Sequence, residues 1–212
     1  MQLHLVTLLN VQCHLWLIPV TRGGMEMGKI SLGTNMYLYP MSINLIGTKI
    51  GEKVNFMAVG FVSRLDMSRP LIGVSINREH ETYHTIMKTQ EFSINVPSAD
   101  LVERVDYCGL VSGKDVDKTP IFDIFYGILP NAPMIQDCPV SFECKVVNTL
   151  DFGLNTLVIG EIVASYADEQ SLTDGHPDVT KFKPILLTMP DNRYWTIGES
   201  LGDAWKIGKT MI

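Results

Sequence analysis

The chain has 212 residues, 46% hydrophobic and 19% charged, a composition typical of one globular domain with its own core. Its formal net charge of −6 excludes a broad basic surface, so we expect no nucleic acid partner and no attachment to an anionic membrane. Its four cysteines form no CxxC pair and no zinc-site spacing, which favours a cytoplasmic protein over a secreted disulfide scaffold.

The beginning of the chain is apolar from Leu3 to Val20, but polar residues interrupt the run and no Lys or Arg precedes it. Both features disfavour a membrane span and a signal peptide. Met25 and Met27 stand just before the first clearly patterned region. We therefore expect residues 1–27 to be an N-terminal extension, whose role the sequence leaves open, and residues 28–212 to form the working domain.

Short runs rich in β-branched and aliphatic residues recur between turn residues and predict strands. The first four are Met41–Gly47, Asn55–Val62, Leu71–Ile76 and Phe92–Val96. Farther along, residues 141–150 and 154–166 flank the turn Asp151-Phe152-Gly153 and predict a long hairpin. Two more strands are expected at residues 185–189 and 194–198.

Helices are expected to be fewer than strands. They are predicted at Thr82–Lys88, at Ala99–Tyr107 with Ser98 as N-cap, at Ile121–Tyr126 and at Leu201–Ile207. The chain shows no internal repeat and no linker rich in Gly, Ser or Pro. The sequence therefore predicts one mainly β domain, a barrel with peripheral helices.

A zinc-protease pattern, HExxH, occurs at His80-Glu81-Thr82-Tyr83-His84. In that motif two histidines one helical turn apart bind zinc and the glutamate activates water. The motif needs a helix that runs through both histidines, whereas this string follows a predicted strand after only three residues. A solvated turn is favoured, we expect no bound metal, and a zinc hydrolase remains a distant alternative.

The segment Gly109–Asp115 is similar to a phosphate-binding P-loop, but only three residues separate its glycines and Asp115 follows its lysine. The P-loop motif needs four residues between the glycines and a Ser or Thr after the lysine. We interpret the segment as a glycine-bearing loop, whose small residues can approach a ligand closely.

Six segments stand in a characteristic order: Asn55–Phe61, Arg69–Ile76, Thr82–Ile86, Phe92–Pro97, Ser112–Lys118 and Tyr194–Lys209. Together they resemble the flavin reductase-like family and, within it, the flavoredoxin branch. The resemblance implies an FMN-binding split β-barrel with peripheral helices, completed as a homodimer. It also implies a cofactor, FMN, that is held without a covalent bond.

The activity implied by the resemblance is that of an FMN-binding oxidoreductase, an NAD(P)H-dependent flavin reductase. Electrons would come from a reduced nicotinamide nucleotide or from a protein electron donor, and no side chain need act as a catalytic nucleophile. The alternative is a non-catalytic FMN electron-transfer protein.

The predicted flavin site combines physical reasoning with the resemblance. An isoalloxazine ring needs polar backbone groups along one edge and an apolar bed, and Asn55–Val59 offers both. A phosphate needs converging N–H groups and a cation, which the turn Asn77-Arg78 and nearby hydroxyls offer. By resemblance, Lys118 stabilises the reduced anion. The predicted residues are Asn55, Phe56, Met57, Ala58, Val59, Phe61, Ser75, Ile76, Asn77, Arg78, Thr82, Tyr83, Thr85, Asn95 and Lys118.

Overall fold

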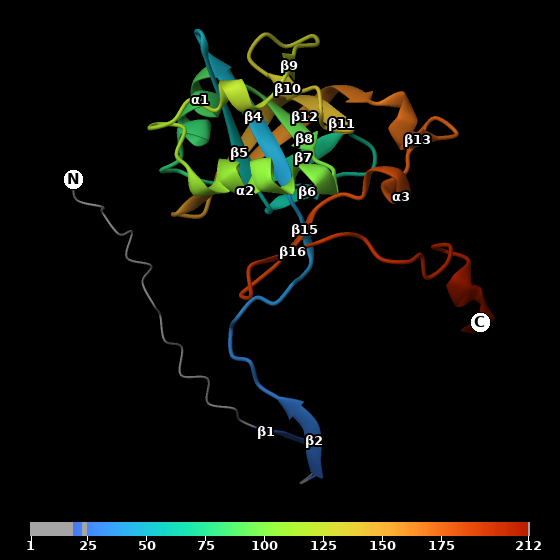
Figure 1. Ribbon diagram of the computed structural model, residues 1–212. Helices are drawn as coiled ribbons and strands as arrows, with labels where there is room; N and C mark the ends of the chain where they lie inside the picture. The colour runs from blue at the N-terminus through green and yellow to red at the C-terminus, as the bar shows by residue number, and fades with distance from the viewer. Residues whose placement is uncertain (1–18, 23–24, 212) are drawn as a thin grey trace. The chain divides into compact units, whose positions relative to one another are not determined.

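The computed structural model describes residues 19–22 and 25–211 (Figure 1). Its chain divides into two units, Met1–Leu38 and Tyr39–Ile212. In the first, β1 (Pro19–Arg22) and β2 (Met25–Ile30) form an antiparallel pair that the sequence did not predict. The apolar run from Leu3 lies outside the described residues as far as residue 18, and the boundary after residue 27 stays a prediction.

A curled sheet of seven strands forms the centre of the second unit (Figure 1). The strand order is β5-β4-β8-β11-β12-β7-β6, and every neighbouring pair is antiparallel. The strands are β4 (Asn44–Ile50), β5 (Lys53–Val59), β6 (Val62–Arg64), β7 (Leu71–Asn77), β8 (Glu91–Val96), β11 (Val140–Asp151) and β12 (Asn155–Ala167). This architecture confirms the prediction of a mainly β fold.

Two helices cover parts of this sheet. α1 (Glu81–Thr89) packs against β4 and β5, and α2 (Val102–Leu110) packs against β5. Both were predicted, although residues Ala99–Leu101 form a 3₁₀ turn that leads into α2. A third helix, α3 (Val179–Phe182), is one short turn whose N-cap Asp178 accepts a hydrogen bond from the N–H of Thr180. Across residues 19–22 and 25–211, no helix is both long and apolar enough to cross a membrane.

A second, smaller sheet joins two strands near the end of the chain to one strand at the start of the second unit. Its order is β16-β15-β3, formed by β3 (Met41–Ser42), β15 (Leu186–Thr188) and β16 (Arg193–Trp195). The run predicted as one strand at Met41–Gly47 is thus divided between β3 and β4, which belong to different sheets. A minor pair joins β13 (Leu172–Thr173) to β14 (His176–Pro177).

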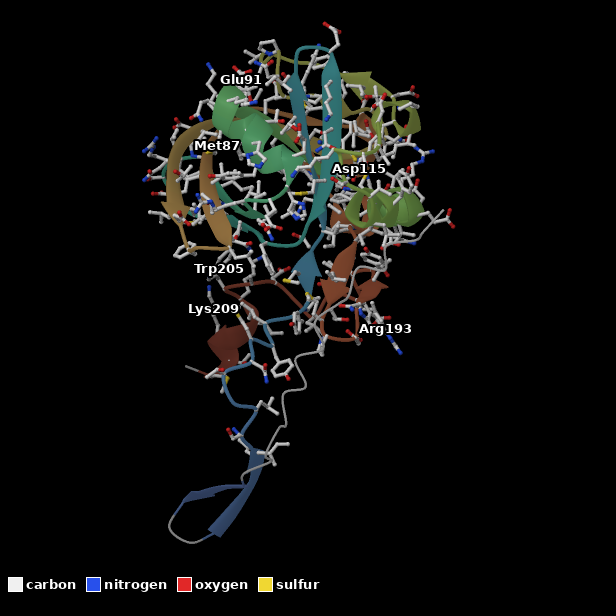
Figure 2. All side chains as sticks on the ribbon, turned by 90° about the vertical axis from the view of Figure 1, so that its left-hand side faces the viewer. Met87, Glu91, Asp115, Arg193, Trp205 and Lys209 are labelled. Atoms are coloured by element: carbon white, nitrogen blue, oxygen red, sulfur yellow. The ribbon has the colours of Figure 1, made fainter. Side chains whose placement is uncertain are left out.

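Two predicted helices are wrong. The segment Ile121–Tyr126 instead follows a 3₁₀ turn (Thr119–Ile121) and forms β9 (Ile124–Phe125), because pairing with β10 (Met134–Ile135) satisfies its backbone. The segment Leu201–Ile207 has Gly202 at φ 136° and Trp205 at φ 59°, which an α-helix does not allow, and only a 3₁₀ turn (Ile207–Met211) follows. Trp205 and Lys209 mark this segment in Figure 2.

The core consists of two clusters on opposite faces of the sheet, as the alternation of β5 shows. Val54 and Phe56 join one cluster, to which the 3₁₀ turn before α2 adds Leu101 and α2 adds Val105. The opposite face of β5 contributes Met57 and Val59 to the other cluster. Alternate residues of a strand point to opposite faces. Burying each such side chain contributes roughly 1.5–3 kcal/mol, so the register of β5 is strongly fixed and places Asn55 on the same face as Met57.

Candidate functional site

A cleft of about 580 Å³ opens beside β5. It is lined by segments of residues 57–61, 75–77, 80–82, 108–113 and 154–155, together with Met41, Asn55, Lys118, Leu187 and Met189. In Figure 2, Met87 marks α1, whose first turn borders the cleft, and Asp115 marks the loop after α2. Small-molecule sites typically measure about 300–1,000 Å³, so the cleft can hold one ligand of cofactor size.

One wall of the cleft comes from the tip of the β11–β12 hairpin. Asp151 Oδ1 accepts a hydrogen bond from the N–H of Gly153 at 2.8 Å, and Gly153 has φ 89°, so the turn matches the predicted Asp-Phe-Gly signal. The register of β12 against β7 then sets Asn155 opposite Asn77. Asn155 Nδ2 donates to Ser75 Oγ at 3.3 Å, which ties the hairpin to the cleft wall.

Asn55 carries an amide that is only partly satisfied. Its side chain is buried, and Nδ2 donates to Thr82 Oγ1 at 2.8 Å, while Oδ1 has no hydrogen-bond partner among the described residues. A buried polar atom without a partner costs roughly 1–3 kcal/mol. A Cβ atom at Gly113 would overlap this amide, so only glycine allows the loop to approach so closely. The amide of Asn55 therefore presents an unpartnered polar atom at the cleft.

Lys118 places a buried ammonium group at the same cleft. It is 1% exposed, and Nζ donates to the carbonyl oxygens of Phe56 at 2.8 Å and Cys108 at 2.9 Å. Over the described part of the chain, Lys118 takes part in no salt bridge. Burial lowers its pKa, with Cys108 acting in the opposite direction. Because an ammonium has three donors, one remains for a ligand.

The thiol of Cys108 also lines the cleft, and burial raises its pKa to about 11 against the opposing influence of Lys118. The thiol is therefore uncharged near neutral pH. It neither neutralises the ammonium of Lys118 nor acts as a ready nucleophile.

The HExxH string lies at the edge of this cleft, and no continuous helix carries both of its histidines. α1 begins at Glu81, so His80 is its N-cap with an extended backbone, and the helix does not run through both histidines. His80 and Glu81 line the cleft, whereas His84 does not. Within residues 19–22 and 25–211, no group of three or more His, Cys, Asp or Glu side chains could hold a metal ion.

The structure brings most of the predicted residues together. Those that line the cleft are Asn55, Met57, Ala58, Val59, Phe61, Ser75, Ile76, Asn77, Thr82 and Lys118. Their roles as flavin contacts stay predictions.

Five predicted residues are not part of the cleft lining. The ring of Phe56 lies in the core, on the face of β5 opposite Met57, and is edge-on to Phe122 with centroids 5.4 Å apart. Its carbonyl still reaches Lys118 at 2.8 Å. Arg78, predicted to bind phosphate, lies outside the cleft lining and pairs with Asp151 at 2.7 Å, and its role stays a prediction.

The other three are Tyr83, Thr85 and Asn95. Tyr83 packs against the core, and Thr85 is buried in α1. Asn95 is fully buried in the sheet, where Nδ2 donates to the carbonyl of Leu45 at 3.1 Å and Oδ1 accepts from the N–H of Ile135 at 2.9 Å. These contacts make Asn95 a structural residue of the sheet.

Several cleft residues were not predicted as part of the site. The loop 109–113 was noted only for its small residues, and His80 and Glu81 only as a zinc pattern, although a turn at a helix start is itself a signal for anion binding. Leu154 and Asn155 follow from the hairpin turn once its partner β7 is known. Leu187 and Met189 lie at the cleft because β15 pairs with β3, and this long-range pairing leaves no local signal in the sequence.

Comparison with known proteins assigns a family to this architecture. The model of the flavin reductase like domain matches residues 36–193, so the chain belongs to the flavin reductase-like family. A solved structure of flavoredoxin from Methanosarcina acetivorans is 47% identical, has a TM-score of 0.84 and shares 87% of this chain and 99% of that one. These findings confirm the predicted resemblance.

Two further solved structures agree with this assignment. The flavoredoxin of Desulfovibrio vulgaris (Miyazaki F) is 31% identical, with a TM-score of 0.80 over 85% of this chain and 100% of that one. A Shewanella frigidimarina protein with a split barrel domain is 25% identical, with a TM-score of 0.69 over 77% of this chain and 85% of that one. The split-barrel fold is confirmed, and the chain falls in the flavoredoxin branch.

Proposed function

We propose that this chain binds FMN without a covalent bond in the cleft and passes electrons from a donor to an acceptor. The observation that carries the proposal is the buried ammonium of Lys118, which has no acidic partner in the described part of the chain and lines the same cleft as the unpartnered Asn55 oxygen. Membership of the flavin reductase-like family and the likeness to two flavoredoxins support it.

The residues of the cleft suit a flavin. Met57, Ala58 and Val59 offer an apolar surface for a planar ring system. The pyrimidine edge of a flavin alternates hydrogen-bond donors and acceptors, which the amide of Asn55 can complement, and Lys118 can offset negative charge. The residues therefore fit the cofactor that the family implies.

Bound FMN would supply the two-electron chemistry that the side chains themselves lack. The protein's contribution is positional and electrostatic. Lys118, held by two carbonyl oxygens, favours any negative charge that develops within reach of its third donor. The apolar residues beside it limit access of water, and no residue needs to form a covalent bond to a substrate.

Two donors are compatible with this site. The mouth of the cleft carries the exposed side chains of Phe61 and Leu110, against which the planar ring of a reduced nicotinamide nucleotide could pack, so we favour an NAD(P)H-dependent flavin reductase. The alternative is a non-catalytic electron-transfer protein that receives electrons from a protein donor. The likeness to two flavoredoxins gives this alternative its weight.

We further propose that the working form is a homodimer. Three large apolar side chains rim the cleft while remaining well exposed: Phe61 at 50%, Leu110 at 76% and Leu154 at 68%. Phe152, two residues before Leu154 at the hairpin tip, is 69% exposed. Contiguous exposed apolar surface commonly marks an interface, and a second copy on this face would complete the walls of the cleft.

The visible spectrum of the purified protein tests these proposals. The spectrum is recorded before and after addition of FMN and desalting, and NADH or NADPH is added last. Retained flavin absorbance that bleaches with the nucleotide supports the reductase. Retained absorbance that bleaches only with a protein donor supports the carrier, and failure to retain flavin at excess FMN would overturn both.

A further inference from the structure

His80 occupies a fixed turn between β7 and α1. The N–H of Glu79 donates to Asn77 Oδ1 at 2.9 Å, and the N–H of His80 donates to the Asn77 carbonyl at 3.1 Å. As N-cap of α1, His80 makes no side-chain capping hydrogen bond, and it lines the cleft. The imidazole is thus available to a molecule bound there.

The charges around His80 come from two directions. Glu79 and Glu81 stand beside it in the chain, and Glu81 is paired with Lys53 at 3.5 Å. Lys118 and Lys114 act from the loop on the other side of the cleft. Cys108 from α2 adds no charge near neutral pH because burial raises its pKa to about 11.

These surroundings favour the neutral form of His80 in the ligand-free protein. Burial is the largest cause that lowers its pKa below the ordinary value of 6.5, followed by the positive charge of Lys118, with Lys114 adding to it and Glu79 opposing. An anion that enters the cleft would offset the charge of Lys118 and favour the charged imidazolium. His80 and Lys118 are the two residues of the described cleft lining that can carry positive charge.

We propose that His80 takes up one proton from solvent when an anionic ligand fills the cleft, so that binding of FMN is linked to pH. The inference rests on the proposed function, because FMN supplies the anion. Binding strength then falls as pH rises through the range in which His80 is charged only in the complex. Within that range, the loss approaches about tenfold in affinity for each pH unit.

The test is calorimetric titration of flavin-free protein with FMN in two buffers of different ionisation enthalpy, from about pH 6 to about pH 7. The difference in binding enthalpy gives the number of protons taken up. The proteins compared are the natural chain, His80→Gln and His84→Gln. His84 is the matched control because it is exposed like His80 but lies outside the cleft, one helical turn farther along α1 and edge-on to Tyr83 at 5.5 Å.

We expect the natural chain and His84→Gln to take up a substantial fraction of one proton more than His80→Gln. The phosphate of FMN also titrates in this range, near pH 6, and the part of its titration that does not depend on His80 is common to all three proteins. Equal proton uptake and equal pH dependence in all three would overturn the inference and leave FMN binding intact. Absence of FMN binding in all three would overturn the proposed function itself.

A second measurement applies if His80→Gln binds FMN too weakly for calorimetry. NMR titration of the imidazole signals of the natural chain, assigned with the two variants, reports each histidine directly. We expect the pKa of His80 to rise on addition of FMN. An unchanged pKa of His80 in the FMN complex would overturn the inference.

Discussion

Burial of Lys118 serves the candidate site but lowers the stability of the folded chain. Its ammonium is buried against two carbonyl oxygens and, among the described residues, no carboxylate forms an ion pair with it. Two carbonyl dipoles only partly replace the hydration that a cation loses on burial. A group held in this way gains most when a ligand brings the missing negative charge.

Replacement of Lys118 by methionine removes that charge while keeping a long apolar side chain. We expect affinity for FMN to fall by about 10- to 100-fold, since a hydrogen bond to a charged group contributes roughly 1.5–3 kcal/mol. The change in the free energy of unfolding should be smaller, because relief of the buried charge offsets the loss of a donor to Phe56 and Cys108. Equilibrium titration with FMN and urea unfolding measure the two quantities separately.

The matched control is Lys145→Met, which removes an exposed lysine from β11 outside the cleft. It should leave FMN affinity within about twofold of the natural value, as expected for surface changes of small energy. If both variants bind FMN equally well, Lys118 has no role in the site.

At the level of single residues, the sequence predicted cleft residues where the alternation along a strand indicated both their place in the chain and the face to which they point. Asn55, Met57 and Val59 alternate on one face of β5 and share the cleft. Phe56 shows the limit, because its side chain packs in the core although its neighbours on β5 line the cleft. Arg78 shows another limit, since its partner Asp151 lies 73 residues away and only the folded hairpin brings it near.

Among the elements, the loop after β9 depends on one buried carboxylate. Glu143 on β11 is fully buried and accepts hydrogen bonds from the N–H groups of Ile128 at 2.8 Å and Leu129 at 2.7 Å. The hydroxyl of Tyr166 on β12 also donates to it at 3.0 Å. A Cβ atom at Gly127 would overlap these groups, so the loop passes directly over the carboxylate.

We expect Glu143→Ala to lower the free energy of unfolding by about 2–3 kcal/mol, because two backbone N–H groups lose a charged acceptor. Tyr166→Phe removes one donor and leaves both backbone hydrogen bonds, so its cost should be clearly smaller. Urea unfolding of the natural chain and both variants gives the comparison. Equal losses in the two variants would show that the loop does not depend on the carboxylate.

A hydrogen bond joins strand β16 to helix α2, and its contribution to stability depends on pH. Tyr194 Oη donates to Asp106 Oδ1 at 2.8 Å, and partial burial together with this hydrogen bond raises the pKa of Tyr194 to about 12. The neutral phenol is favoured in the folded state, so its contribution to stability is fully present below the ordinary pKa near 10. That contribution is lost as pH rises through about 12.

Tyr194→Phe should therefore abolish the part of the pH dependence that this hydroxyl causes. Between about pH 10 and about pH 12, the natural chain should lose stability relative to the variant. Urea unfolding across this range measures the difference, and tyrosinate absorbance should show one late-ionising phenol fewer in the variant. Parallel pH profiles for the two proteins would contradict the assigned hydrogen bond.

The elements that the sequence predicted well are those whose signals are local. The long hairpin follows from two alternating runs around the turn at Gly153, and α1 and α2 follow from local start signals and their places between strands. The position of β8 between β4 and β11 leaves no such signal, because its partners lie far away in the chain. The same holds for Ile124–Phe125, where pairing with β10 prevails over the predicted helix.

At the scale of the whole molecule, the exposed apolar residues around the cleft bear on whether two copies assemble. The hairpin tip projects Phe152 beside the cleft residue Leu154, and both are largely exposed in the single chain. If a second copy covers this face, assembly and ligand binding stabilise each other, because a ligand that binds only the assembled form shifts the equilibrium toward it. FMN should therefore raise the apparent stability of the dimer.

Phe152→Glu tests this coupling without changing a residue that lines the cleft. A carboxylate buried in an apolar interface is costly, so we expect the variant to sediment as a single chain at concentrations where the natural protein sediments as two. Its affinity for FMN should fall as well, because the second copy would no longer complete the cleft.

Met67→Glu is the control: Met67 is 85% exposed and lies at the opposite end of β7 from the hairpin tip. A natural protein that sediments as one chain while binding FMN tightly would show that the cleft is complete by itself, whereas a monomeric Phe152→Glu variant with weakened binding would place the second copy in the site.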